Sequence, residues 1–164
     1  MKEEQFKEIY NTHYGKVIRL CLGYVARDMA LAKDLAQDVF LKVWQHQDSF
    51  RNESGYGTWI YRITVNTCLS QLRKNKKRRG HGKVNEELLY DPGEQTQDNE
   101  KLLQHLYGCI DQLSKMDKGI ILLELEGLPQ QEIAEIAGYS HAAVRTRIHR
   151  IKQKLEKCLR DASI

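Results

Sequence analysis

The residues best placed to bind a ligand lie near the C-terminal end of the chain, where cations far outnumber acids. Between Ser140 and Arg160 the only acid is Glu156. The basic residues of this segment are Arg145, Arg147, Arg150, Lys152, Lys154, Lys157 and Arg160. Seven positive charges less one negative charge leave +6 on one short segment. Such a density of cations favours a polyanion such as nucleic acid as the ligand.

The pattern of apolar residues predicts that this basic segment is the second helix of a helix-turn-helix. Val144, Ile148 and Ile151 recur at helical spacing, and the stripe continues through Leu155 and Leu159. A short helix is predicted over residues 130–137, followed by Gly138 for a tight turn and Ser140 as an N-cap. The predicted contacts to duplex DNA are Ser140, His141, Arg145, Thr146, His149 and Arg150. A solvated basic face in an ordinary helical bundle is the alternative.

A second group of candidate residues interleaves aromatic and basic side chains between positions 52 and 74. Aromatic rings can stack on exposed bases while cations hold phosphates, so this pattern suits single-stranded nucleic acid. A polar loop before the helix could also receive a base rotated out of its stack. The candidates are Asn52, Ser54, Tyr56, Tyr61, Arg62, Asn66, Arg73 and Lys74. Trp59 and Ile63 are instead predicted to be core residues.

Helical periodicity throughout the 164-residue chain predicts an all-α protein with two small helical domains joined by a flexible linker. The first domain is predicted over residues 1–79 and the second over residues 100–164. Residues 80–99 form the predicted linker, because they are poor in apolar side chains and most of their charged side chains are acidic. No strand pattern of any length is present.

Little in the sequence predicts catalysis, a metal or a cofactor. No glycine-rich phosphate loop and no paired metal-ligand spacing occurs, and His105 with Cys109 is a weak pair without further ligands. The four cysteines are widely separated, at Cys21, Cys68, Cys109 and Cys158. All four are predicted to be buried and reduced. With no secretory signal and no membrane-spanning run, the sequence predicts a protein of the reducing cytoplasm.

Three passages resemble the bacterial sigma factors of the extracytoplasmic function group, which belongs to the sigma-70 family. Residues 32–44 look like that group's polymerase-binding helix. Phe50-Arg51 with residues 58–66 is similar to its promoter-melting segment. Residues 126–136 with residues 144–150 resemble its −35-binding domain. The three passages follow the family's order and cover nearly the whole chain.

The resemblance implies a transcription initiation factor that binds core RNA polymerase, directs it to promoters and promotes strand opening. Duplex and melted promoter DNA are the other implied partners, a membrane-associated anti-sigma factor is a further one, and no small-molecule substrate is expected. The implied polymerase contacts are Asp34, Gln37, Asp38, Phe40, Val43 and Trp44. The candidates between positions 52 and 74 would capture the −10 strand, and those from Ser140 to Arg150 would bind the −35 element.

Two other classes of function stay open on the residues themselves. One is a helix-turn-helix regulator that never joins polymerase. The other is a nucleic-acid-processing enzyme whose acidic residues hold a metal.

Overall fold

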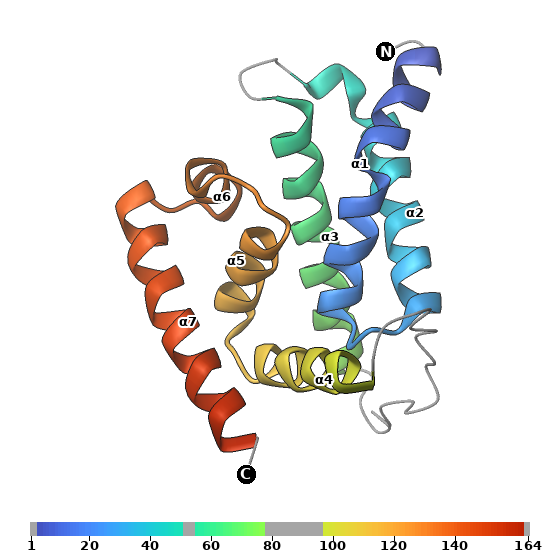
Figure 1. Ribbon diagram of the computed structural model, residues 1–164. Helices are drawn as coiled ribbons and strands as arrows, with labels where there is room; N and C mark the ends of the chain where they lie inside the picture. The colour runs from blue at the N-terminus through green and yellow to red at the C-terminus, as the bar shows by residue number, and fades with distance from the viewer. Residues whose placement is uncertain (1–2, 51–54, 78–96, 163–164) are drawn as a thin grey trace. The chain divides into compact units, whose positions relative to one another are not determined.

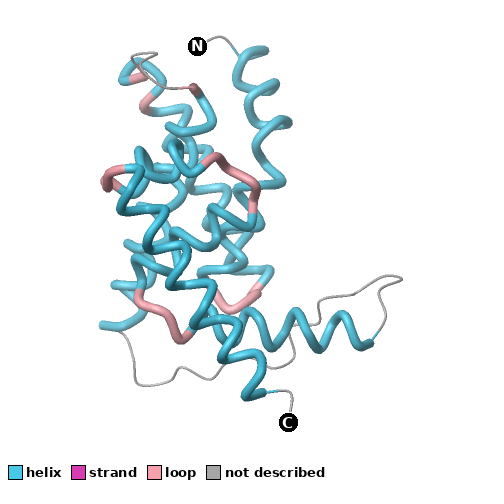
Figure 2. The backbone as a smooth tube through the Cα atoms, turned by 60° about the vertical axis from the view of Figure 1, so that its left-hand side comes forward, coloured by secondary structure: helices cyan, strands magenta, loops and turns pink. Residues whose placement is uncertain are grey.

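The computed structural model describes residues 3–50, 55–77 and 97–162, and over these residues the protein is all-α. Seven α-helices and one short 3-10 helix are present there, without a strand (Figure 2). The all-α prediction is thus confirmed. The chain divides into two compact units, residues 1–85 and residues 86–164. The predicted linker, residues 80–99, lies outside the described residues except for its last three, which belong to a helix of the second unit.

The first unit is a bundle of three helices, each packed against the other two. They are α1 (Glu3–Tyr24), α2 (Met29–Gln45) and α3 (Tyr56–Lys77), and the 3-10 helix η1 (Gln47–Ser49) follows α2 (Figure 1). Burying one face of each helix supplies most of the stability of such a bundle. Its fully or almost fully buried apolar residues include Val17, Leu20, Cys21, Ala32, Ala36, Val39, Val43, Ile60 and Cys68.

The turn between α1 and α2 combines two unusual backbone conformations with a helix cap. Ala26 and Arg27 have positive φ values of 52° and 64°, a region that costs residues with a Cβ free energy. Asp28 then caps α2, because its carboxylate accepts the Leu31 N–H at 3.0 Å. The chain thereby reverses within a few residues and α2 begins at Met29.

The second unit contains α4 (Gln97–Asp111), α5 (Lys115–Leu125), α6 (Gln130–Ala137) and α7 (His141–Ala162). The predicted helix-turn-helix is confirmed as α6 and α7. Gly138 ends α6 in the left-handed conformation, with φ 78°, as a glycine after a helix commonly does. Ser140 caps α7, since its Oγ accepts the Ala143 N–H at 3.1 Å.

Helix α7 packs against α4, α5 and α6 through the predicted apolar stripe. Val144, Ile148 and Ile151 are at most 2% exposed. A disulfide joins Cys109 in α4 to Cys158 in α7, so the prediction of four reduced thiols was wrong for this pair. The two helices bring these Cα atoms within 6.0 Å although 49 positions separate them in sequence, a proximity that local spacing does not reveal.

Candidate nucleic-acid interface

The exposed face of α7 carries the predicted DNA contacts. Arg145, Thr146, His149 and Arg150 are all exposed. They lie opposite the buried stripe of Val144, Ile148 and Ile151, which holds the helix in place. The Thr146 hydroxyl donates a hydrogen bond to the Ala142 carbonyl at 3.1 Å, leaving its lone pairs to accept a hydrogen bond from a base. Two guanidinium groups, an imidazole and a hydroxyl therefore share one face, a set of groups suited to base edges and phosphates.

Some polar residues at the start of α7 are already used in contacts within the protein. Ser140 and His141 are both exposed, but the Ser140 Oγ already accepts the capping N–H of Ala143. Arg147, part of the basic run, is not on the exposed face. Its Nη1 donates to the Asp117 carboxylate at 3.1 Å. The charge that α7 presents to a polyanion is therefore smaller than the sequence count implies.

Helix α3 has two opposite faces, one polar and exposed, the other buried. Arg62, Asn66 and Arg73 lie at spacings of four and seven, which places them on one helical stripe. These three residues and Lys74 are exposed. The opposite face, which is at most 4% exposed, consists of Ile60, Tyr61, Thr64, Thr67 and Cys68. The first unit thus displays a row of polar and basic side chains on a helix that its core holds firmly.

Tyr61 belongs to the buried face of α3, and its predicted role as a nucleic-acid contact was wrong. The side chain is 3% exposed. Its hydroxyl lies 2.9 Å from Nδ1 of His13 in α1. Burial, with a smaller contribution from Lys16, lowers the pKa of His13. Tyr61 neighbours the exposed Arg62 in sequence, but one residue is about 100° around a helix, which is enough to turn its ring inward.

An aromatic cluster stands at the start of α3. The ring of Tyr56, which is half-buried, stacks on Phe50 with a centroid separation of 4.1 Å. Its hydroxyl accepts a hydrogen bond from Nε2 of Gln5 at 3.0 Å. Trp59 also lies against Phe50, at 5.2 Å. Trp59 and Ile63, predicted as core residues, are both half-buried, and Asn52 and Ser54 lie outside the described residues.

The outer face of α2 forms a third surface. Asp34, Gln37, Asp38 and Trp44, four of the implied polymerase contacts, are exposed on this face. Leu41, which the sequence analysis missed, lies among them and is 52% exposed. Its position four residues after Gln37 and three before Trp44 could have indicated this. We define the α2 surface as Asp34, Gln37, Asp38, Leu41 and Trp44.

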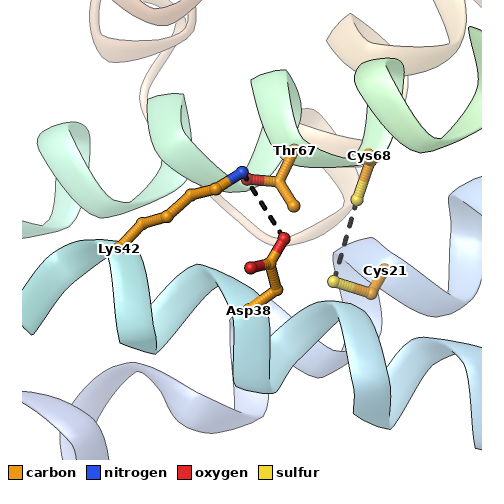
Figure 3. A network of polar contacts seen from close by, with 5 residues as sticks. All are labelled: Cys21, Asp38, Lys42, Thr67 and Cys68. Atoms are coloured by element: carbon orange, nitrogen blue, oxygen red, sulfur yellow. Dashed lines mark hydrogen bonds and ion pairs between the residues drawn. The ribbon is translucent and has the colours of Figure 1, made fainter. Parts of the chain in front are cut away.

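The edge of the α2 surface is tied to α3 through Lys42. The Lys42 Nζ lies 3.4 Å from the Asp38 carboxylate and donates to the Thr67 hydroxyl at 3.1 Å (Figure 3). Asp38 keeps about half of its side chain exposed, at 49%. The carboxylate is therefore held in one region of the surface while staying accessible to a partner.

Phe40 and Val43 do not belong to the α2 surface, and their predicted role as direct partner contacts was wrong. They are 3% and 0% exposed. Phe40 packs against Tyr10 of α1, with ring centroids 4.6 Å apart. Large apolar residues next to the polar stripe of a helix usually fill the core, as these two do.

The remaining cysteines are structural. Cys21 and Cys68 are free and buried, as predicted, with their sulfurs 3.8 Å apart (Figure 3). The hydrogen bond to Cys21 and burial raise the pKa of the Cys68 thiol, so it stays protonated and unreactive. Cys109 is used in the disulfide, which removes it from the weak pair with His105.

Within residues 3–50, 55–77 and 97–162, no three potential metal-ligating side chains come together. None of the helices described there combines the length and the apolar character needed to cross a membrane.

Comparison with known families matches both units of the chain. Residues 9–78 match the model of sigma-70 region 2, and residues 103–155 match that of sigma-70 region 4. The chain is 33% identical to the ECF RNA polymerase sigma-E factor of Haemophilus influenzae, over 94% of this chain and 87% of the relative. It is 34% identical to the RNA polymerase sigma factor YlaC of Bacillus subtilis, over 94% of this chain and 91% of the relative.

Two solved structures share the fold. One is the sigma factor RpoE in complex with the anti-sigma factor NepR from Bartonella quintana, with a TM-score of 0.78 and 24% identity over 96% of this chain and 98% of that one. The other is CnrH in complex with the cytosolic domain of CnrY, with a TM-score of 0.74 and 20% identity over 99% and 92%. The fold similarity thus extends across both units.

Proposed function

Because this chain belongs to the extracytoplasmic function group of the bacterial sigma-70 family, we propose that its two units divide the work of starting transcription. The chain binds core RNA polymerase, directs it to promoters and promotes strand opening. The first unit carries the region 2 match and the second unit the region 4 match.

The α2 surface is the docking site for core polymerase in this proposal. It combines two carboxylates, an amide and two large apolar side chains on one exposed helical face. Such a mixture of apolar area and charge suits a stable protein interface. Phe40 and Val43 support this surface from beneath, because both are buried in the core of the same unit.

The exposed stripe of α3 receives the −10 strand. Arg62, Asn66, Arg73 and Lys74 offer cations for phosphates and an amide for a base edge. The aromatic cluster of Phe50, Tyr56 and Trp59 stands at the start of the same helix, where a base leaving the duplex could stack. A site that prefers single strands shifts the promoter toward its open form by that preference.

The exposed face of α7 binds the −35 element as duplex DNA, with its N-terminal half in the major groove. The observation that most supports the proposal is this face: four polar and basic side chains are exposed together on a helix whose opposite stripe is fully buried. Arginine side chains so presented can reach guanine edges or phosphates.

The chemistry of RNA synthesis stays with polymerase, so this chain needs no catalytic residue, metal or cofactor of its own. Its place of action is the cytoplasm, where core polymerase works. We also expect an anti-sigma partner, anchored at the membrane, that covers the polymerase-binding surfaces until a signal releases it. One solved neighbour is a complex with the anti-sigma factor NepR, and the other is a complex with the cytosolic domain of CnrY. These two complexes support the expectation of a protein regulator.

The direct test of the docking site is capture of the chain by immobilised core polymerase. Leu41→Arg places a charge in the centre of the α2 surface and should weaken binding by about tenfold or more, as expected for a central interface residue. Glu8→Arg is the matched control, because Glu8 is an exposed residue of α1 outside that surface. Failure of the wild-type chain to bind core polymerase, or equal binding by the Leu41 variant, would contradict the proposed docking.

A further inference from the structure

Arg147 occupies a position between the two faces of α7. It is flanked in sequence by exposed candidates for DNA contact, Thr146 before it and His149 two residues after it. Its own side chain is 37% exposed. On a helix, residue 147 points neither with Arg145 and His149 nor fully with the buried stripe. Its guanidinium therefore lies at the border between the DNA-facing side and the core.

The guanidinium is engaged by two partners from other parts of the second unit. Nη1 donates to Oδ1 of Asp117 in α5 at 3.1 Å. The Cζ atom lies 4.6 Å from the centroid of the Tyr139 ring, within the range of a cation–π interaction. Arg147 thus links α7 to α5 and to the turn that joins α6 with α7.

Asp117 and Tyr139, the two partners of Arg147, are themselves held in place by the structure around them. Asp117 lies in the first turn of α5, where the Ser114 Oγ accepts its backbone N–H at 3.2 Å, and its side chain is only 16% exposed. Tyr139 lies between Gly138 and Ser140, and its N–H donates to the Ala134 carbonyl at 3.1 Å. An arginine bound to two such fixed points has little freedom to turn toward a phosphate.

We infer that Arg147 is a positioning residue, which holds the exposed face of α7 at the angle needed to read the −35 element. This inference rests on the proposed function of α7. A phosphate contact would neutralise DNA charge directly, whereas a positioning residue acts through Arg145, Thr146, His149 and Arg150. Loss of Arg147 should therefore impair recognition at several base pairs together, without changing the number of phosphates contacted.

The test uses holoenzyme assembled from core polymerase and the full chain, on a promoter duplex selected from random-sequence DNA by the wild-type holoenzyme. Affinity is measured against salt concentration at 25 °C for Arg147→Ala, Arg147→Lys, Asp117→Asn and Arg150→Ala. Log affinity falls as log salt rises, and we call the steepness of this fall the salt slope. Each loss of a phosphate contact should make the salt slope shallower by about 0.9. Duplexes with single substitutions in the −35 element report base discrimination.

We expect Arg147→Ala and Asp117→Asn each to weaken binding by about tenfold with an unchanged salt slope and reduced discrimination at several −35 positions. The variant that combines Arg147→Ala with Asp117→Asn should bind DNA no worse than the single variant with the lower affinity, because both substitutions break the same contact. Arg147→Lys, which keeps a cation near Asp117 and Tyr139, should restore part of the affinity. Arg150→Ala serves as the comparison, because Arg150 is an exposed arginine, and this substitution should make the salt slope shallower.

Three results would overturn the inference. A salt slope lowered by about 0.9 in Arg147→Ala, with Asp117→Asn binding as well as wild type or better, would make Arg147 a phosphate contact. Unchanged affinity in folded Arg147→Ala and Asp117→Asn would leave only a structural ion pair. Inability of the wild-type holoenzyme to enrich any duplex would remove the proposed function and this inference with it, a result distinguishable from the other two.

Discussion

Nδ1 of His13 and the hydroxyl of Tyr61 lie 2.9 Å apart, which ties α1 to α3 inside the first unit. Burial, and to a lesser extent Lys16, lowers the pKa of His13 below its ordinary value of 6.5. The unfolded chain therefore binds more protons than the folded chain just below pH 6.5, so stability falls as pH drops through this region toward the folded pKa. Above pH 6.5, His13 is neutral in both the folded and the unfolded chain, and it no longer lowers the stability.

We predict that the urea midpoint of the first unit decreases between pH 7 and pH 5, and that His13→Gln reduces this decrease. Tryptophan fluorescence reports this unit alone, because the chain's two tryptophans, Trp44 and Trp59, both lie in it. An equal decrease in the variant and the wild type would show that His13 does not cause it.

The disulfide between Cys109 and Cys158 should stabilise only the second unit, because it joins α4 to α7. We predict that Cys158→Ser lowers the free energy of unfolding of this unit by about 2–4 kcal/mol. Amide hydrogen exchange followed by mass spectrometry would locate the loss to α4 and α7, while the tryptophan transition stays constant. A phosphine reductant should destabilise the wild type similarly and leave the variant unchanged. Four titratable thiols in the unreduced, denatured protein would contradict the pairing.

Two glycines should respond in opposite directions to the same substitution. Gly138 has φ 78°, and a Cβ there would meet nothing within 4 Å, so Gly138→Ala costs only backbone strain. We predict a loss of about 1 kcal/mol in the stability of the second unit. Gly108 lies inside α4 with the same open surroundings, and Gly108→Ala should add about 0.5–1 kcal/mol. Denaturation followed by circular dichroism measures both, and equal signs would refute the explanation.

Phe40 and Leu41 are neighbours in sequence with opposite expected effects. Phe40 is 3% exposed and Leu41 is 52% exposed. We predict that Phe40→Ala lowers the stability of the first unit by about 3–5 kcal/mol, the range for a buried phenylalanine. Leu41→Ala should change stability little and weaken binding to core polymerase instead. Fluorescence-monitored unfolding and core capture separate the two effects, and a large loss of stability in Leu41→Ala would contradict the assignment.

Where the apolar period was regular, the sequence was enough to predict the elements. The stripe through Val144, Ile148 and Ile151 predicted the orientation of α7. Gly138 correctly marked the end of α6, and Ser140 the start of α7. These features depend on contacts within a few residues, so local patterns contain them.

Where neighbouring residues differ in the direction they face, the sequence was less informative. The interleaved aromatic and basic residues of α3 suggested nucleic acid, yet Tyr61 turns inward and Arg62 outward. In the sequence, Arg147 was one of seven basic residues, and only its contact with Asp117 of α5 set it apart. The pairs Arg147–Asp117 and Cys109–Cys158 join residues 30 and 49 positions apart, and such contacts follow from tertiary packing rather than from local spacing.

The two-unit initiation function is most directly tested by permanganate probing of promoter DNA bound by core polymerase with and without this chain. Supercoiled library DNA enriched by the holoenzyme serves as template, and primer extension on the transcripts locates the start sites. We expect transcripts and permanganate-reactive thymines upstream of the start only when the chain is present, and weaker thymine reactivity with Asn66→Ala at equal promoter occupancy. Core polymerase that, with the chain bound, starts at no defined site and opens no DNA would contradict the proposed function.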